Sequence, residues 1–223
     1  MLELVTTGDG SKTIYNSEVG ENYHSKHGAL QESRHVFLNA GLIHFLADKN
    51  VSEVSILEVG LGTGLNFLLS ADYCSVNQTK LYYTGIEAYP LSSELIGQTG
   101  YEQYISPAVW DSFIKFYPDS LKQPVNITPF CELQTANCKL LDYDSNKQYD
   151  VIYFDAFAAA YQPEMWNESA ISRTIQFLKP GGVFVTYAIT GNLKRMLKIL
   201  GLKVEKAPGA PGKREMLRAI KPL

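Results

Sequence analysis

The sequence predicts an α/β fold built around a mostly parallel sheet. Short apolar runs alternate with segments of helical spacing between residues 51 and 201, as in successive strand–helix–strand units. One of these runs, residues 55–60, ends in a glycine-rich turn that leads directly into a helical pattern. A chain of 223 residues is long enough for one large domain of this class.

The predicted elements follow one another in order. Apolar runs predict strands at residues 55–60, 80–88, within 127–138, at 149–157 and at 183–188. Helical spacing occurs at residues 64–76, 165–178 and 191–201, and in shorter pieces between 91 and 124 that Pro107, Pro118 and Pro124 interrupt. The sequence KPGG (179–182) is expected to end the second of these helices. Residues 202–207 and 214–220 alternate apolar and charged side chains, which predicts an antiparallel pair joined by the loop 207–212.

The first fifty residues differ from this pattern. They are expected to form a loop that becomes a helix from about Ala29, and they are too few to build a separate core. We therefore expect an N-terminal cap of residues 1–50 packed on an α/β domain of residues 51–223. All four histidines lie in the cap at spacings that match no metal-binding motif, so we expect ordinary polar roles and no metal site.

Composition excludes several classes of protein. No run of eighteen apolar residues occurs, so no membrane span is predicted. The N-terminus has no basic region followed by an apolar run, so no secretory signal is predicted. The three cysteines have no CxxC spacing, which argues against a disulfide framework and against structural zinc. We expect a cytoplasmic protein.

Charge is divided unevenly along the chain. From Gly191 onward there are nine Lys and Arg against two acids, a balance of +7, while residues 1–190 carry −10. Such a division suggests a polyanionic partner for the basic part. The alternative is that these cations form an ordinary solvated face, and charge alone does not separate the two interpretations.

The strongest local motif is LEVGLGTGLNFL (57–68), in which a strand leads through Gly60, Gly62 and Gly64 into a helix. Glycines allow a tight turn and a close approach of the backbone to a ligand. The spacing is neither the GxGxxG of dinucleotide enzymes nor a phosphate-binding loop with GK[ST]. An acid, Glu58, before a shorter glycine turn suits S-adenosylmethionine, whose amino group a carboxylate can hold. We expect Glu58, the three glycines and Asn66 to bind this cofactor; the alternative is a plain strand–helix turn.

Further polar residues follow other predicted strands. Glu87 ends the second strand, where an acid can accept hydrogen bonds from both ribose hydroxyls. Asn137 follows the third strand and is expected to meet the adenine edge. Asp155 ends the next strand, at the edge of the sheet where open α/β folds bind ligands. A buried charge there is costly unless it is paired or solvated, which favours a functional role.

An aromatic cluster follows Asp155. Phe157, Tyr161 and Trp166 surround Pro163, and they could stack on a base or close over the cofactor. For Trp166 we consider packing of the loop an equal alternative.

Together these motifs resemble the MnmC-type methyltransferases, the family that modifies the wobble uridine of tRNA. The resemblance covers nearly the whole chain and includes ENYHSKHGALQESRHVFL (21–38), EVGLGTGLNF (58–67), DAFAAAYQPEMW (155–166), LKPGGVFVTYAITGNLKRML (178–197) and GKREML (212–217). It implies a Rossmann-like class I S-adenosylmethionine-dependent methyltransferase fold. The expected sheet is mostly parallel, has seven strands and ends in an antiparallel C-terminal strand.

The resemblance also implies a reaction. The family transfers a methyl group from S-adenosylmethionine to the primary amine of 5-aminomethyl-(2-thio)uridine in the tRNA anticodon. Many relatives carry a fused flavin-dependent oxidase. Since this chain ends at Leu223, we expect the form without the oxidase, no flavin, and a separate oxidase or an upstream modification enzyme as a partner.

Several residue roles follow from the resemblance. Asp155 would orient the acceptor amine, while Phe157 and Tyr187 would line the pocket between the methyl donor and the base. Ser25 and Glu32 in the cap would reach the same cleft. The cations expected to hold the phosphates of the anticodon stem-loop are Lys194, Arg195, Lys213 and Arg214.

Two other functions remain open from the residues. One is a related transferase, either a small-molecule N-methyltransferase or a polyamine aminopropyltransferase; the basic C-terminal part argues against it. The other is a non-catalytic module that binds RNA or the cofactor; the presence of Glu58, Glu87 and Asp155 argues against it.

Overall fold

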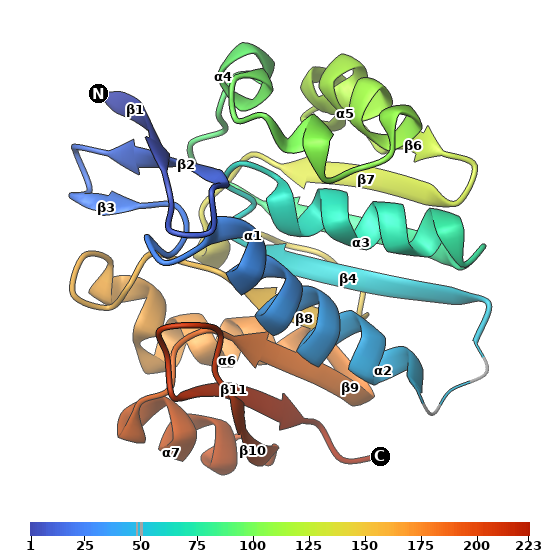
Figure 1. Cartoon of the computed structure of the whole chain (residues 1–223). Helices are drawn as coiled ribbons and strands as arrows, with labels where there is room; N and C mark the ends of the chain where they lie inside the picture. Colours follow the sequence, from blue (N-terminus) through green and yellow to red (C-terminus); the bar gives the residue numbers. More distant parts are fainter. Residues whose placement is uncertain (48, 50) are drawn as a thin grey trace.

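A central eight-stranded sheet organises the computed structural model, which describes residues 1–47, 49 and 51–223 (Figure 1). The predicted boundary between cap and domain, at residue 50, lies outside the described residues. The strand order is β10-β11-β9-β8-β4-β5-β7-β6. The strands are β4 (Glu53–Val59), β5 (Lys80–Ile86), β6 (Val125–Thr128), β7 (Cys131–Ala136), β8 (Tyr149–Phe154), β9 (Leu178–Thr186), β10 (Lys203–Pro208) and β11 (Glu215–Ile220).

The middle of the sheet is parallel and its edges are antiparallel. Strands β7, β5, β4, β8 and β9 pair in parallel, whereas β11 pairs antiparallel with both β9 and β10. The mostly parallel sheet and the antiparallel C-terminal strand are thus confirmed. The strand count was one too low, because residues 125–136, where one strand was predicted within 127–138, form a hairpin: β6 and β7 are antiparallel and turn at Pro129 and Phe130.

The KPGG segment was predicted wrongly. Helix α6 (Glu168–Gln176) already ends before it, and residues 179–182 lie inside β9. The pairing of β9 with β8 changes register there, and a Cβ on Gly182 would meet the carbonyl oxygen of Asp150 at 3.0 Å. Gly and Pro therefore mark an irregular strand at this point and not the stop of a helix.

Each face of the sheet carries its own core. Along β4, Ile56 belongs to one cluster of buried side chains and its neighbour Leu57 to the other, as the two-residue period of a strand requires. The first core is covered by α3 (Leu65–Val76), α5 (Pro107–Ser120) and the helical segment α1 (Ala29–Glu32), η1 (Ser33–Ile43) and α2 (His44–Ala47). The second is covered by α6, α7 (Gly191–Ile199) and the short turn η3 (Leu140–Asp142). Shorter pieces are α4 (Ser93–Gly97), η2 (Tyr101–Gln103) and η4 (Pro163–Trp166).

The N-terminal segment combines an unpredicted sheet with the predicted helix. Strands β1 (Leu2–Thr6), β2 (Lys12–Asn16) and β3 (Glu21–Asn22) form a small antiparallel sheet beside the carboxyl ends of the parallel strands (Figure 1). The helix begins at Ala29 as predicted, and its middle is wound as a π-helix. Val36 and Phe37 of that helix are buried in the first core, so this segment covers part of the central sheet.

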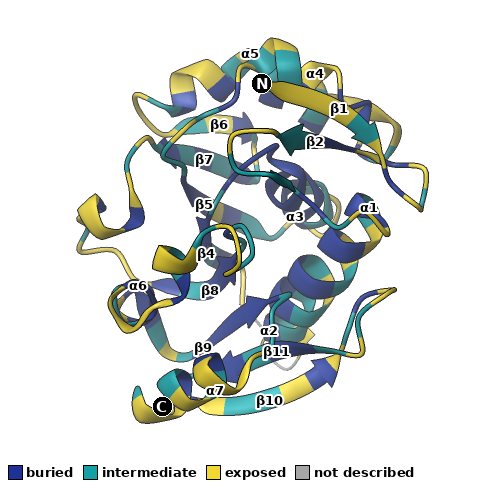
Figure 2. Cartoon of the chain, turned by 90° about the vertical axis from the view of Figure 1, so that its left-hand side faces the viewer, coloured by how far each residue is buried: buried dark blue, intermediate teal, exposed yellow. Residues whose placement is uncertain are grey.

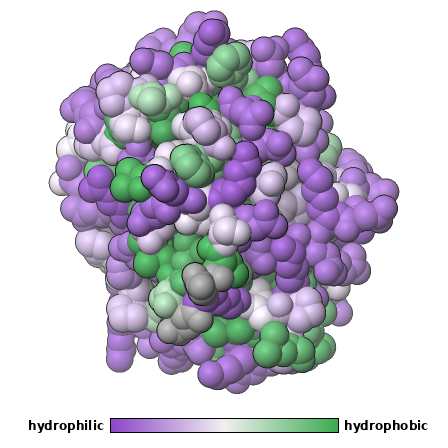
Figure 3. All heavy atoms as spheres, turned by 90° about the vertical axis from the view of Figure 1, so that its right-hand side faces the viewer, coloured by the Kyte–Doolittle hydropathy of each residue, from purple (hydrophilic) through white to green (hydrophobic). Residues whose placement is uncertain are grey.

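The outer surface adds two observations. Hydrophilic groups cover most of the end opposite the small N-terminal sheet, with separate apolar areas between them (Figure 3). Among the described residues, no helix combines the length and the apolar character needed to cross a bilayer.

Candidate active site

A large cleft opens at the carboxyl ends of β4, β5, β7 and β8, below the small N-terminal sheet. Its volume is about 1380 Å³, which exceeds the 300–1,000 Å³ of ordinary small-molecule pockets. Figure 2 views the molecule from this end. Of the predicted site residues, those that line the cleft are Gly60, Gly62, Glu87, Asn137, Asp155 and Phe157.

The glycine loop forms the floor of the cleft. Gly60 and Gly62 have φ angles of +87° and +53°, which side chains other than glycine rarely adopt. A Cβ on Gly60 would lie 2.6 Å from the carbonyl oxygen of Asp155, and one on Gly62 would lie 2.8 Å from the ring of Tyr23. Glycine is therefore required here both by conformation and by the close approach of neighbouring segments.

Glu87 holds the glycine loop from the next strand. Its carboxylate accepts hydrogen bonds from the backbone N–H groups of Gly62 (2.9 Å) and Tyr89 (3.0 Å). Burial raises the pKa of this carboxyl, while the backbone donors oppose that rise. Glu87 thus lies at the end of β5 as predicted from its position, facing the cleft with acceptor capacity left over.

Glu58 does not reach the cleft wall. Its side chain is fully buried (0% exposed) and accepts hydrogen bonds from Asn66 Nδ2 (2.8 Å) and from the hydroxyl of Tyr83 (2.7 Å). Burial, followed by the charge of Asp155, raises its pKa well above the ordinary value. Asn66 and Tyr83 thus hold the Glu58 carboxyl in the interior beside the glycine loop, and its direct contact with the cofactor stays a prediction.

Asn66 links the two carboxylates. Its Nδ2 donates to Glu58 and also to Asp155 Oδ2, at 2.8 Å each, and its Oδ1 is buried without a partner. Asn66 is buried, so it braces the site from below and supports Asp155 from the side away from solvent.

Asp155 lies at the junction between the cleft and a cluster of acids. Its backbone N–H donates to Val59 O (2.9 Å), which fixes the turn after β8 beside the glycine loop. Burial, followed by the charge of Glu32, raises its pKa well above the usual range, while Asn66 and Lys213 oppose the rise. Such a carboxyl lies where charges converge and is a candidate for chemistry.

We define the acidic cluster as Glu21, Glu32 and Asp155. Glu21 Oε2 accepts from the backbone N–H of Ala158 (2.8 Å), and Glu32 Oε1 accepts from that of Ser25 (3.0 Å). Glu32 is only 5% exposed. The cap residues Ser25 and Glu32 therefore lie together beside Asp155. Sequence reasoning missed Glu21, although it opens the same motif, ENYHSKHGALQESRHVFL.

Lys213 completes this cluster. Its ammonium lies 2.6 Å from Glu32 Oε2 and 4.1 Å from the centroid of the Tyr187 ring. The side chain is 32% exposed. Lys213 was predicted to bind phosphate together with Arg214, yet its charge is directed into the cluster; Arg214 is the exposed member of the pair.

Aromatic side chains connect the two sides of the cleft. The ring of Tyr23, a residue that sequence reasoning missed, contacts that of Phe157 edge-on at 5.0 Å. Tyr187 donates its hydroxyl proton to Ala156 O at 2.8 Å. Trp166 is only 8% exposed and donates to Phe157 O, so of its two predicted roles the structure favours packing. Tyr161 is half-exposed on the rim.

The other predicted residues lie at the periphery. Asn137 is exposed on the cleft wall directly after β7. Gly64 begins α3 with φ +77° and packs against Phe113 away from the cleft. Lys194 and Arg195 occupy the first turns of α7, which follows β9 at the carboxyl edge of the sheet.

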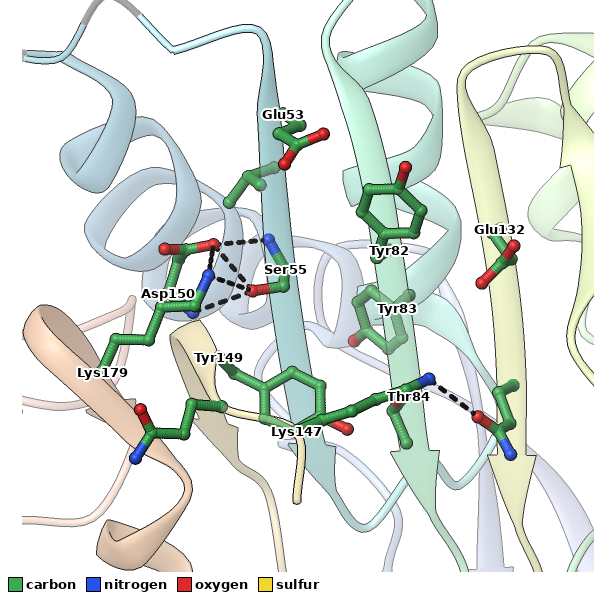
Figure 4. A pocket seen from close by; sticks show the side chains of 13 residues that line it. Glu53, Ser55, Tyr82, Tyr83, Thr84, Glu132, Lys147, Tyr149, Asp150 and Lys179 are labelled. Carbon is green, nitrogen blue, oxygen red and sulfur yellow. Dashed lines mark hydrogen bonds and ion pairs between the residues drawn. The ribbon is translucent and has the colours of Figure 1, made fainter. Parts of the chain in front are cut away.

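A second, smaller groove of about 360 Å³ lies over the amino-terminal halves of β4, β5 and β8 (Figure 4). Asp150 Oδ2 there accepts from Ser55 N (2.8 Å), Ser55 Oγ (2.7 Å) and Lys179 Nζ (3.0 Å), as Figure 4 shows. These groups satisfy one another's hydrogen-bonding capacity and link β4 to β9 through Asp150 of β8. Within the part of the chain that the structure describes, no group of three His, Cys, Asp or Glu is arranged to hold a metal ion.

The chain is similar to several proteins of known type. Several curated relatives are named tRNA 5-methylaminomethyl-2-thiouridine biosynthesis bifunctional protein MnmC. The chain is 30% identical over 209 residues to the one from Leptospira borgpetersenii serovar Hardjo-bovis (strain JB197), and the match covers 87% of this chain and 31% of the relative. It is 29% identical over 233 residues to that of Acinetobacter baylyi, with 96% and 36% covered. The chain thus spans about a third of the length of these relatives.

A solved structure and a family model agree with these matches. The crystal structure described as MNMC2 from Aquifex aeolicus has a TM-score of 0.77 at 23% identity, covering 100% of this chain and 73% of the other, which establishes the fold. The model of a family described as S-adenosyl-L-methionine-dependent methyltransferase matches residues 106–222. The predicted resemblance to MnmC-type proteins is confirmed by these matches. With more than half of its residues matched, the chain belongs to the S-adenosyl-L-methionine-dependent methyltransferases.

Proposed function

We propose that this enzyme transfers the methyl group of S-adenosylmethionine to the primary amine of 5-aminomethyl-(2-thio)uridine at the wobble position of tRNA. The observation that carries the proposal is the acidic cluster, which adjoins the glycine-loop cleft through Asp155. Carboxylates beside the methyl donor suit an amine acceptor, because they accept N–H hydrogen bonds. The names of the curated relatives, which refer to a methylaminomethyl uridine in tRNA, support the same choice.

The residues of the cleft fit the cofactor. Gly60 and Gly62 leave the backbone accessible on the floor, Glu87 can accept from the ribose hydroxyls, and Asn137 lies on the wall beyond it. The volume of about 1380 Å³ leaves room for a nucleotide beside the cofactor. Glu58 would support this cradle indirectly, through Asn66.

Positioning is the main task of the protein in this reaction. The bound cofactor supplies a methyl group already activated by its sulfonium: the carbon–sulfur bond breaks with its electron pair remaining on sulfur, and the carbon–nitrogen bond forms. The acceptor nitrogen must therefore hold a free lone pair. Asp155 accepts an N–H hydrogen bond from the amine and directs that lone pair toward the donor. After transfer, the carboxylate stabilises the cationic product amine until its proton passes to solvent.

We propose that the half-buried Lys194 and the exposed Arg195 and Arg214 contact the phosphates of the anticodon stem-loop. They belong to the basic part of the chain, and phosphate contacts fix the position of a nucleic acid more than its sequence. The three cysteines are free thiols, which suits the cytoplasm as the compartment of the reaction.

The acidic cluster also favours a second candidate. A free polyamine is a small cation, and Glu21, Glu32 and Asp155 would attract it. The same enzyme would then methylate a soluble amine and not a nucleoside in tRNA. Lys213, which occupies part of the cluster with its own positive charge, argues for the first candidate.

One experiment separates these functions. Purified enzyme receives labelled S-adenosylmethionine together with tRNA that carries the unmethylated aminomethyl group, and in parallel with free polyamines. We expect label in the wobble nucleoside of the tRNA digest. Label only in the polyamines would establish the second candidate, and label in neither would reject both acceptors.

The role of Asp155 is tested in the same assay. Asp155→Asn keeps an acceptor for Asn66 but loses the charge, so we expect methyl transfer to fall by about 100-fold. Cofactor binding, measured by calorimetry, should persist. Asp111→Asn, on the exposed side of α5, is the matched control. Wild-type turnover by Asp155→Asn would contradict the proposed mechanism.

A further inference from the structure

Lys213 reaches the acceptor side of the cleft from a loop that is braced against the N-terminal segment. His35 Nε2 lies 2.7 Å from the carbonyl oxygen of Pro208, at the start of the loop between β10 and β11. Gly212 has a φ of +88° and lies so close to the ring of His27 that a Cβ would be 2.8 Å from it. Lys213 N then donates to Ala210 O at 2.8 Å. These contacts fix the direction of the Lys213 side chain.

Two ionisable groups contact the Lys213 ammonium, and two more lie within range of its charge. Glu32 of α1 pairs with it directly, and the ring of Tyr187, after β9, lies beneath it. Asp155, after β8, and Glu21, on β3, lie near enough for its charge to lower the pKa of each carboxyl. Among the described residues of this pocket, Lys213 thus supplies the positive charge that opposes the three carboxylates of the acidic cluster.

This balance matters for the proposed reaction. An amine reacts with a methyl donor only when it is neutral, and neighbouring carboxylates favour its cationic form. Three unopposed acids would therefore hold the acceptor as an unreactive ammonium ion. A fixed cation in the same pocket acts in the opposite direction, both on the amine and on Asp155.

We propose that Lys213 is a positioning residue for methyl transfer: by holding Glu32 and offsetting the acidic cluster, it lets the acceptor amine bind in its neutral form beside an ionised Asp155. The inference rests on the proposed function, since it requires an amine as the acceptor. Lys213 acts through Glu32 and Asp155, so its effect is on the protonation state of the pocket and not on tRNA phosphates.

The test is the pH dependence of the single-turnover rate of methyl transfer to tRNA, whose acidic limb reports the groups that must lose a proton in the bound complex. In Lys213→Met we expect this limb to move to higher pH by about one unit. Lys213→Arg keeps the charge and should restore the wild-type limb. Lys206→Met, on the same hairpin but paired with Glu215, is the control and should leave the limb in place.

A second variant keeps the test decisive if Lys213→Met fails to fold. Glu32→Gln removes a negative charge and should move the acidic limb to lower pH, opposite to Lys213→Met. A purely structural role would lower the rate equally at every pH. If the acidic limb of the pH–rate profile stays in place in folded Lys213→Met and Glu32→Gln, or moves in the same direction in both, the inference is overturned while the proposed function stands. If wild-type enzyme methylates no tRNA at any pH, the proposed function itself fails, and the inference fails with it.

Discussion

Asn66 offers the sharpest test of how the site is held together. Its Nδ2 donates to Glu58 and to Asp155 at 2.8 Å each, so Asn66→Ala removes two hydrogen bonds to carboxylates at once. A hydrogen bond to a charged group contributes about 1.5–3 kcal/mol. Since water from the cleft can replace the bond to Asp155, we expect a loss of about 3 kcal/mol in the free energy of unfolding at pH 8.

The loss should depend on pH with a definite sign. Burial raises the pKa values of Glu58 and Asp155 well above their ordinary values of 4.5 and 3.8, so the folded state binds more protons than the unfolded state. Stability therefore falls as pH rises from the ordinary values of these carboxyls through their raised ones. Asn66 donates to the charged forms and limits that fall. As pH falls and protonation neutralises these carboxyls, the loss in Asn66→Ala should shrink toward about 1–2 kcal/mol, as for neutral bonds.

Urea unfolding followed by tryptophan fluorescence at pH 5 and pH 8 measures both values. Ser70→Ala is the matched control, because Ser70 lies on the same helix and its hydroxyl donates to the carbonyl oxygen of Asn66. The hydroxyl also lies 3.2 Å from that of Tyr153, whose pKa burial raises above its ordinary value of 10.0, so neither partner changes charge between pH 5 and pH 8. The cost of Ser70→Ala should be about 1 kcal/mol at both pH values. An equal loss at both pH values in Asn66→Ala would refute the view that Asn66 stabilises two carboxylates.

Two further predictions concern binding. Glu87→Ala removes the acceptor for Gly62 N–H, and because a hydrogen bond to a charged group is lost, cofactor binding measured by calorimetry should weaken at least about tenfold. The control Glu94→Ala, at an exposed position on α4, should bind the cofactor normally. Unchanged affinity in Glu87→Ala would contradict the placement of the cofactor. Arg195→Ala with Arg214→Ala should weaken tRNA binding and reduce its dependence on salt by about two phosphate contacts, without changing cofactor affinity. Filter binding across a salt series that gives the wild-type slope would show that these cations are only solvated.

Local pattern was sufficient for the parts of the site that one strand–loop–helix unit builds. The glycine loop after β4 and the acids at the ends of β5 and β8 were predicted because parallel strands bring their carboxyl ends to one edge of the sheet. The start of the N-terminal helix at Ala29 was predicted equally well.

The remainder depends on contacts between distant segments. Glu58 follows the motif of a cofactor ligand, yet its burial is decided by Tyr83 of the neighbouring strand and by Asn66. Lys213 was assigned to phosphate because charge clusters near it in sequence; its partner Glu32 lies 181 positions away. The small N-terminal sheet was missed because its strands are too short to show a period.

The distance in sequence between Glu32 and Lys213 has a consequence for how the enzyme becomes competent. The glycine loop, Glu87 and Asp155 are synthesised before the β10–β11 hairpin, and β11 joins the central sheet by pairing with β9. Until that pairing forms, the acidic cluster lacks the ammonium of Lys213, the counter-charge that the inference above assigns to it. On that inference, the chemistry of the site is completed by the last strands of the sheet to be synthesised, although the glycine loop, Glu87 and Asp155 come from its middle.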